Sequence, residues 1–139
     1  MSAYTNQSSI QGRIPPPDLI AALDDGTSGG NLNTALLAQI ISDVSAELDG
    51  YLASVYPVPY TGSIPPAVAD ACLHMVCAVI QARRLQPPDI NVWNEDAERW
   101  RLTIKGYGEG VGNLGPNFPK QIPPGLVVVE WMAMDMTTA

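Results

Sequence analysis

Apolar residues recur every three or four positions along residues 33–55, as they do on one face of a helix. They are Leu37, Ile41, Val44, Leu48, Tyr51, Leu52 and Val55. This spacing predicts a long helix over 33–55 with one apolar face. Pro57 sets its end, because proline cannot continue a helix and pushes the preceding Tyr56 toward extended geometry. Either Asn31 or Asn33 is expected to cap its start.

Gly50 lies inside the predicted 33–55 helix, where glycine costs roughly 1 kcal/mol relative to alanine. Two interpretations are open. Either another helix approaches the backbone closely at Gly50, or the helix simply tolerates the glycine. We favour the close approach, which makes Gly50 an expected packing position.

The pattern predicts three further helices, over 18–25, 65–86 and 91–105. Asp18 is expected to cap the first of them. Pro65 and Pro66 suit the first turn of the second, where the N–H that proline lacks has no helical partner in any case. This second helix is apolar nearly all round, which predicts that it lies at the centre of the protein.

The predicted helix over 91–105 is amphipathic. Its apolar face carries Trp93, Ala97, Trp100 and Ile104. Two pairs have the spacing of ion pairs on a helix surface, namely Glu95 with Arg99 and Glu98 with Arg101. Gly106 is expected to end this helix.

The segments outside the helices differ in composition. Residues 1–16 are mostly polar and predict an extended N-terminal arm. From residue 107 onward Gly, Pro and Asn dominate, until the β-branched run at 126–132 predicts one strand. A single strand needs a partner, which is either another segment of this chain or a neighbouring subunit. The candidate interface residues of this strand are Val127, Val129 and Trp131.

The sequence therefore predicts a mainly α fold, a small bundle of about four helices. Residues 1–106 are assigned to a helical domain that includes the N-terminal arm, and residues 107–139 to a C-terminal arm. A chain of 139 residues supports one core of ordinary size, whereas two domains would each be very small.

Charged residues are few, and acidic residues outnumber basic ones. Apolar residues make up 46% of the chain and charged residues 15%, so the surface is either largely neutral or covered by other subunits. A covered surface favours a component of an assembly. Seven basic and fourteen acidic residues give a net charge of -7, which opposes binding to a phosphate backbone. We expect no specific nucleic-acid binding.

Cys72 and Cys77 lie five positions apart in the predicted 65–86 helix, about 140° around its axis, so they should not bond to each other. We expect buried, reduced thiols of a cytosolic product. The chain starts without the pattern of a signal peptide and has no apolar run of membrane-spanning length, so we expect no contact with a membrane.

Two glycine-containing patterns resemble ligand sites. Gly110, Gly112 and Gly115 spell the dinucleotide-binding pattern, but a predicted helix precedes them where the fingerprint requires a strand. A loop is therefore favoured. Asp24-Asp25-Gly26 lacks the spaced oxygen ligands of a calcium loop, so a turn is favoured there.

Two side-chain clusters also have structural explanations that we favour. Cys72, His74 and Cys77 point to different sides of a helix, so they should not bind one metal ion. Asp43 and Glu47 share a helix face, but no His, Lys or metal ligand is near them in sequence, so an acidic surface is favoured over a catalytic pair. The sequence thus predicts no catalytic residue, no cofactor and no metal, and we expect the protein not to be an enzyme.

Residues around the end of the long predicted helix resemble a known family. They read Asp49-Gly50-Tyr51-Leu52-Ala53, followed by Tyr56-Pro57-Val58-Pro59. Further matching residues are Asp18-Leu19-Ile20, Pro65-Pro66 and Glu95-Asp96-Ala97. With these residues the chain resembles the Mu-like bacteriophage head-to-tail adaptor family, small helical proteins also called head-tail connectors or head completion proteins. The resemblance covers about residues 14–106, and Val55 stands where family members often carry arginine.

This resemblance implies a structural virion protein of the neck, made in the host cytoplasm. Copies of the chain are expected to form a homo-oligomeric ring, commonly twelve-fold, beneath the portal protein. The ring would extend the DNA channel and offer a docking surface to a tail, stopper or tail terminator protein.

The resemblance also gives expectations for individual residues. The family motif, an expected packing junction with the 65–86 helix, consists of Asp49, Gly50, Tyr51, Leu52, Tyr56, Pro57 and Pro59. Asp43 and Glu47 are expected to face either the channel or a neighbouring subunit.

Two other functions stay open at this stage. The first is a tail terminator or tail completion protein, whose rings are usually built on β-sheet, so a strand-rich protein would favour it. The second is a small regulatory protein that binds a ligand in a cavity around Cys72, His74 and Met75. A defined monomer that retains a small molecule would favour that function.

Overall fold

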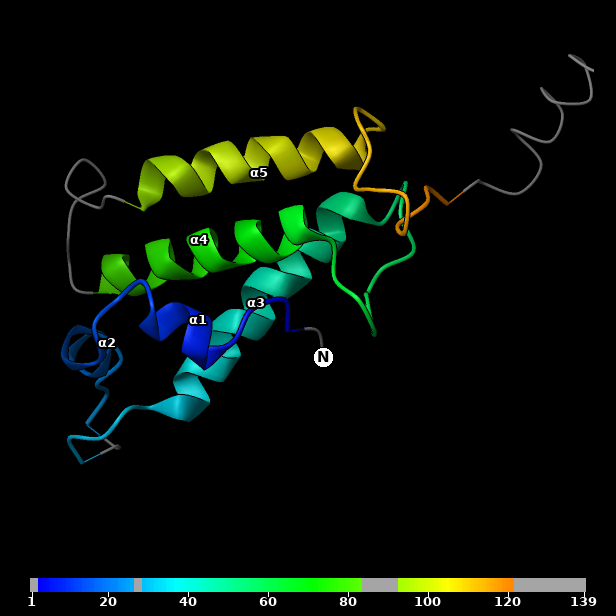
Figure 1. Ribbon diagram of the computed structural model, residues 1–139. Coiled ribbons are helices and arrows are strands. Elements are labelled where there is room, and N and C mark those ends of the chain that lie inside the picture. The colour runs from blue at the N-terminus through cyan, green and yellow to red at the C-terminus, as the bar shows by residue number, and fades with distance from the viewer. Residues whose placement is uncertain (1–2, 27–28, 84–92, 122–139) are drawn as a thin grey trace, which may run out of the picture.

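The computed structural model describes residues 3–26, 29–83 and 93–121 (Figure 1). These residues form five helices: α1 Gln7–Gln11, α2 Pro16–Ala22, α3 Thr34–Leu52, α4 Pro66–Arg83 and α5 Asn94–Gly108. α4 and α5 lie side by side, and α3 packs against both. No strand occurs within these ranges. The prediction of a mainly α helical bundle is confirmed.

α4 lies at the centre of the bundle, as its nearly uniform apolar sequence predicted. It packs against each of the other four helices. Nine of its residues are buried: Val68, Ala71, Cys72, Leu73, Met75, Val76, Cys77, Ala78 and Ile80. It begins at Pro66, in agreement with the expected proline start, and its predicted end at residue 86 lies outside the described residues.

The ends of α3 follow from local hydrogen bonds. The side-chain oxygen of Asn33 accepts a bond from the N–H of Leu36 at 3.1 Å, which identifies Asn33 as the cap. α3 ends at Leu52, earlier than predicted, and a turn follows in which the N–H groups of Val55 and Tyr56 both donate to the carbonyl of Leu52. The prolines that follow keep the chain from resuming the helix.

The prediction of an extended N-terminal arm is wrong, because the described part of this segment folds onto the bundle. Asn6 caps α1 by accepting a bond from the N–H of Ser9 at 2.9 Å, and α1 packs against α4. Tyr4, Ile10 and Ile14 are 3%, 0% and 1% exposed. These three apolar side chains gain enough from burial to hold a segment whose other residues are largely polar.

α2 starts two residues before its predicted start. Pro15 precedes the helix and Pro16 is its first residue, which is a favoured place for proline. Asp18 therefore does not cap α2. It lies in the first turn, where its negative charge interacts favourably with the helix dipole.

α5 ends three residues later than the predicted end at residue 105. Gly106 lies within the helix, which continues to Gly108. The actual stop is Gly110, whose positive φ of 90° lets the chain reverse. The N–H of Val111 donates to the carbonyl of Gly106 at 2.9 Å, and that of Gly110 to Tyr107 at 3.0 Å, which is the Schellman pattern.

Residues 109–121, the described segment after α5, return toward the connection between α3 and α4. Leu114 is buried, and the N–H of Gln121 donates to the carbonyl of Val55. The predicted strand over 126–132, with Val127, Val129 and Trp131, lies outside the described residues. Within the described residues, no helix has both the length and the apolar character needed to cross a membrane.

Candidate functional site

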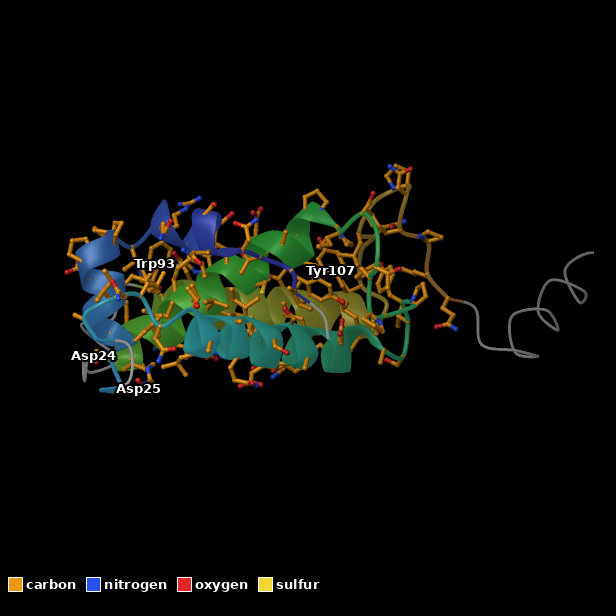
Figure 2. The ribbon with its side chains drawn as sticks, turned by 90° about the horizontal axis from the view of Figure 1, so that it is seen from below. Asp24, Asp25, Trp93 and Tyr107 are labelled. Carbon is orange, nitrogen blue, oxygen red and sulfur yellow. The ribbon has the colours of Figure 1, made fainter. Side chains whose placement is uncertain are left out.

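The family-like motif lies at one end of the bundle, which we call the loop end. Here the α3–α4 connection, residues 53–65, meets residues 109–121 (Figure 1). In Figure 2, Tyr107 lies toward this end, whereas Asp24, Asp25 and Trp93 lie toward the other. The loop end brings together segments that are far apart in sequence, so it is the first candidate site for binding a partner.

Tyr56 is the central residue of the loop end. Its side chain is 0% exposed, and its hydroxyl accepts a hydrogen bond from the N–H of Leu114 at 3.2 Å. Leu52, one turn earlier, is also fully buried. These two motif residues thus belong to the hydrophobic core, and Tyr56 additionally fixes the segment that follows α5.

Tyr4 joins the N-terminal segment to the same end. Its backbone N–H donates to the hydroxyl of Ser45 at 3.1 Å. Its own hydroxyl donates to the carboxylate of Asp49 and accepts from the N–H of Tyr60 at 2.9 Å. Asp49 is therefore a structural acceptor for the N-terminal segment.

Pro57 and Pro59, the two motif prolines, line a groove of about 300 Å³ at the loop end, together with Tyr60 and Phe118. The rings of Tyr60 and Phe118 meet edge to face, with centroids 5.6 Å apart. Burial raises the pKa of Tyr60 to about 12, and the neighbouring Tyr56 and Tyr4 add to this shift. The groove is thus lined mainly by apolar and aromatic groups.

Glu47 lies in the seam between α3 and α5 and is not an unpaired carboxylate. It accepts a bond from Arg101 Nε at 2.9 Å and another from the hydroxyl of Tyr51. Arg101 also contacts Glu98, and Lys105 Nζ lies 5.0 Å from the centre of the Tyr51 ring. Burial and the bond to Glu47 raise the pKa of Tyr51. Burial acts to lower the pKa of Arg101, but its bonds to Glu47 and Glu98 outweigh this and raise it.

Asp43 lies one turn before Glu47 but has different surroundings. It is exposed, and its carboxylate accepts a bond from the side-chain amide of Gln39 at 2.8 Å. The two acidic residues are thus not arranged as a joint catalytic pair: Glu47 links two helices, and Asp43 faces outward.

Gly50 does not mark a close helix contact, so that prediction is wrong. A Cβ atom added to Gly50 would have nothing within 4 Å, and the residue is exposed. The close contact between α3 and α5 occurs instead at Gly108 of α5. The sequence held no signal for this, because the crossing point of two helices is not encoded in local spacing.

The Cys72, His74 and Cys77 cluster is dispersed around α4, as its spacing predicted. The Sγ of Cys72 lies 3.5 Å from the hydroxyl of Ser45 on α3. His74 instead meets the rings of Trp93 and Trp100, at centroid distances of 5.4 and 6.0 Å. No group of side chains suited to a metal ion occurs among the described residues.

Both cysteines are free and buried, in agreement with the prediction. Burial raises the pKa of Cys72 to about 11 and that of Cys77 to about 12. Because the thiolate is the reactive form of cysteine, both side chains act as small apolar core groups at neutral pH.

The two glycine-containing patterns are turns. Gly110, Gly112 and Gly115 all have positive φ, at 90°, 75° and 132°, in the loop after α5. Asp24 accepts a bond from the N–H of Gly26 at 2.9 Å, which closes a turn at the end of the molecule labelled in Figure 2. Both predictions of a loop or turn are confirmed.

The sequence patterns did not predict that Tyr4 holds the N-terminal segment to the loop end. They also did not predict that Arg101 is the partner of Glu47. A signal for the N-terminal helix existed, because Ile10 and Ile14 are four apart and follow Asn6, a favoured capping residue.

Comparison with known proteins identifies a family. A family model described as Bacteriophage Mu, Gp36 matches residues 4–115. The match covers all five helices and extends from Tyr4 to the segment that Tyr56 binds. No curated protein matches the chain.

Proposed function

Because this chain belongs to the bacteriophage Mu Gp36 family, which indicates a structural or morphogenesis protein of a phage, we propose that it is a head-to-tail adaptor. Copies of the chain form a ring beneath the portal protein, extend the DNA channel and present a docking surface to the tail. In this role the protein is not an enzyme. It needs no cofactor and belongs to the neck of the virion.

The observation that carries the proposal is the extent of the family match. It spans residues 4–115 and therefore includes all five helices, the α3–α4 connection and the first part of the segment after α5. Three tyrosines, Tyr4, Tyr56 and Tyr60, tie separate segments together at the loop end. A site that is built from several chain segments suits contact with a protein partner.

The charge distribution also supports a channel component. Over residues 1–60 Arg13 is the single basic residue, whereas six residues are acidic: Asp18, Asp24, Asp25, Asp43, Glu47 and Asp49. The net charge of -7 opposes binding to the phosphate backbone, which supports a channel that DNA passes without being held. The helical fold of the described residues supports an adaptor over the β-sheet ring of a tail terminator.

Electron microscopy of purified portal rings mixed with this protein tests the proposal. We expect an added ring of density on the portal, on the side from which DNA enters the tail. Portal rings that remain unchanged at high concentrations of the protein would contradict the adaptor function. A monomer in the absence of portal would not, because such subunits can assemble only on their partner.

A variant that ends at Gln121 tests the role of the C-terminal arm. Phe118 packs on Tyr60, and Gln121 bonds to Val55, so this variant keeps the described contacts of the loop end. We expect unchanged helicity and loss of attachment to portal or tail. Normal attachment of the shortened chain would contradict the proposed role of the arm.

A further inference from the structure

The groove at the loop end is an apolar surface that the described residues leave uncovered. Its walls carry three proline rings and two aromatic rings, those of Pro57, Pro59, Pro119, Tyr60 and Phe118. The three prolines are exposed and the two aromatic residues are half-buried. Among the described residues that line the groove, none is charged. A neutral groove of about 300 Å³ suits one large apolar side chain.

The aromatic wall of the groove is held in place by contacts on both sides of Tyr60. The N–H of Tyr60 donates to the hydroxyl of Tyr4 at 2.9 Å, and the two rings lie 6.1 Å apart between centroids. On its other side the Tyr60 ring meets Phe118 at 5.6 Å between centroids. The groove is therefore formed before any occupant arrives, so binding costs little ordering of the wall.

The C-terminal segment leaves the described structure at the edge of this groove. Phe118 and Pro119 line the groove, and two residues later the N–H of Gln121 is fixed to the carbonyl of Val55. Residues 122–139 therefore start beside the groove. Trp131 lies ten positions beyond Gln121, which gives it a reach of at most about 35 Å.

The sequence of this segment matches the groove in chemistry. Residues 126–132 are apolar except for Glu130, and Trp131 is their one aromatic residue. A tryptophan ring gains from edge-to-face contact with other aromatic rings, such as those of Tyr60 and Phe118. The pair Pro124-Gly125 directly precedes the apolar residues and favours a turn, which directs the chain back toward the loop end.

We propose that Trp131 occupies the loop-end groove of its own chain, with residues 126–132 folded back over the loop end. The occupant is the same chain because a short tether gives an effective concentration on the order of 1 mM, which a second copy in dilute solution does not reach. The contact covers two apolar surfaces of the free subunit at once. It goes beyond the proposed function, because it concerns the subunit before any partner binds, and a partner that uses either surface displaces it.

Fluorescence quenching by acrylamide tests this contact without portal. The Trp131 signal is the difference between the emission of the wild type and that of Trp131→Phe, and a synthetic peptide of residues 122–139 provides the fully accessible reference. We expect a quenching constant for Trp131 at least threefold below that of the peptide, and unchanged over a hundredfold dilution of the protein. A constant equal to that of the peptide would overturn the proposal. Protection that disappears on dilution would identify a second copy as the occupant and would overturn it too.

Two substitutions in the groove test where Trp131 binds. Gly62 lines the groove, is exposed and is not one of the glycines with positive φ, and a Cβ atom added to it has nothing within 4 Å. Gly62→Leu should therefore fill the groove without disturbing the fold and should raise the quenching constant to the peptide value. Ser63→Glu, also at an exposed position in the groove, should do the same by placing a charge beside the ring.

Gly50→Leu is the matched control. Gly50 is also exposed and also has nothing within 4 Å of an added Cβ, but it lies on α3 and does not line the groove. This variant should keep Trp131 protected, and circular dichroism checks the helicity of all three variants. Protection that survives both groove substitutions, or is lost equally in the control, would overturn the assignment to this groove. These outcomes leave the adaptor proposal untouched, since it is tested by ring formation on the portal.

Discussion

The backbone of Gly108 in α5 packs directly against the carbonyl oxygen of Tyr51 in α3, so closely that a Cβ atom would lie 1.7 Å from that oxygen. The carbonyl of Gly108 also accepts a bond from the hydroxyl of Ser54 at 3.1 Å. Only a residue without a side chain fits this crossing point, so the distance between α3 and α5 depends on Gly108.

Gly108→Ala should therefore lower the free energy of unfolding by about 1–3 kcal/mol, because the methyl group must push two packed backbones apart. Gly50→Ala is the matched control. Its site is exposed, helical and open, so alanine should raise the free energy of unfolding by about 0.5–1 kcal/mol. Urea denaturation measures both changes. Equal effects of the two substitutions would contradict the close contact at Gly108.

Tyr4→Phe should weaken the attachment of the N-terminal segment. The substitution keeps the buried ring but removes the hydroxyl that donates to Asp49 and accepts from the N–H of Tyr60. A partly buried N–H without a partner costs about 1–3 kcal/mol, so we expect a loss of that size and faster proteolysis near the N-terminus. Tyr107→Phe is the control and should change stability by less than about 0.5 kcal/mol. A Tyr4→Phe protein as stable as the wild type would show that this hydroxyl is dispensable.

Stability should decrease at alkaline pH. Burial raises the pKa of Cys72 from 9.0 to about 11 and that of Cys77 from 9.0 to about 12, and it raises the pKa of Tyr60 from 10.0 to about 12. Between about pH 9 and 12 the folded protein therefore holds more protons than the unfolded chain. Its free energy of unfolding falls as the pH rises through this range and is unaffected by these groups below it.

Urea midpoints at pH 8, 9, 10 and 11 test this dependence. Cys77→Ala removes one of the three groups, so its midpoint should fall less steeply than that of the wild type over the same interval. The comparison of slopes is independent of any constant loss of stability that the substitution causes. A midpoint that stays constant up to pH 11 would contradict the inferred protonation of the buried groups.

The features that the sequence predicted correctly depend on local physics. The cap at Asn33 and the start of α4 at Pro66 are set within a single turn. The central position of α4 follows from its composition, since a helix that is apolar nearly all round must be covered on most sides. Each of these needs knowledge of only a few neighbouring residues.

The features that the sequence did not reveal depend on contacts between distant residues. Tyr4 and Asp49 are 45 positions apart, and Glu47 and Arg101 are 54 positions apart. Spacing arguments cannot pair such residues, because the pairing follows from how the helices cross. For the same reason the close approach was predicted at Gly50, where a local rule suggested it, and occurs at Gly108.

The ion pair between Glu47 and Arg101 should contribute more to stability than an ordinary surface pair, because it connects two helices and is largely screened from solvent. The side chains of Glu47 and Arg101 are 34% and 24% exposed, and Nε lies 2.9 Å from the carboxylate. A double-mutant cycle with Glu47→Gln and Arg101→Gln isolates this interaction, and the glutamine at position 47 still accepts the bond from Tyr51. We expect a coupling energy of about 1 kcal/mol that decreases with added salt.

The pair of Glu95 and Arg99 is the matched control for this cycle. It lies on the same helix at 3.0 Å, but its side chains are 82% and 69% exposed. Exposed pairs at this spacing typically contribute about 0.3–0.5 kcal/mol. A larger coupling for Glu47 with Arg101 than for Glu95 with Arg99 would mean that the seam between α3 and α5 is held by charge as well as by apolar packing. Equal couplings would mean that apolar packing and the contact at Gly108 alone hold the two helices together.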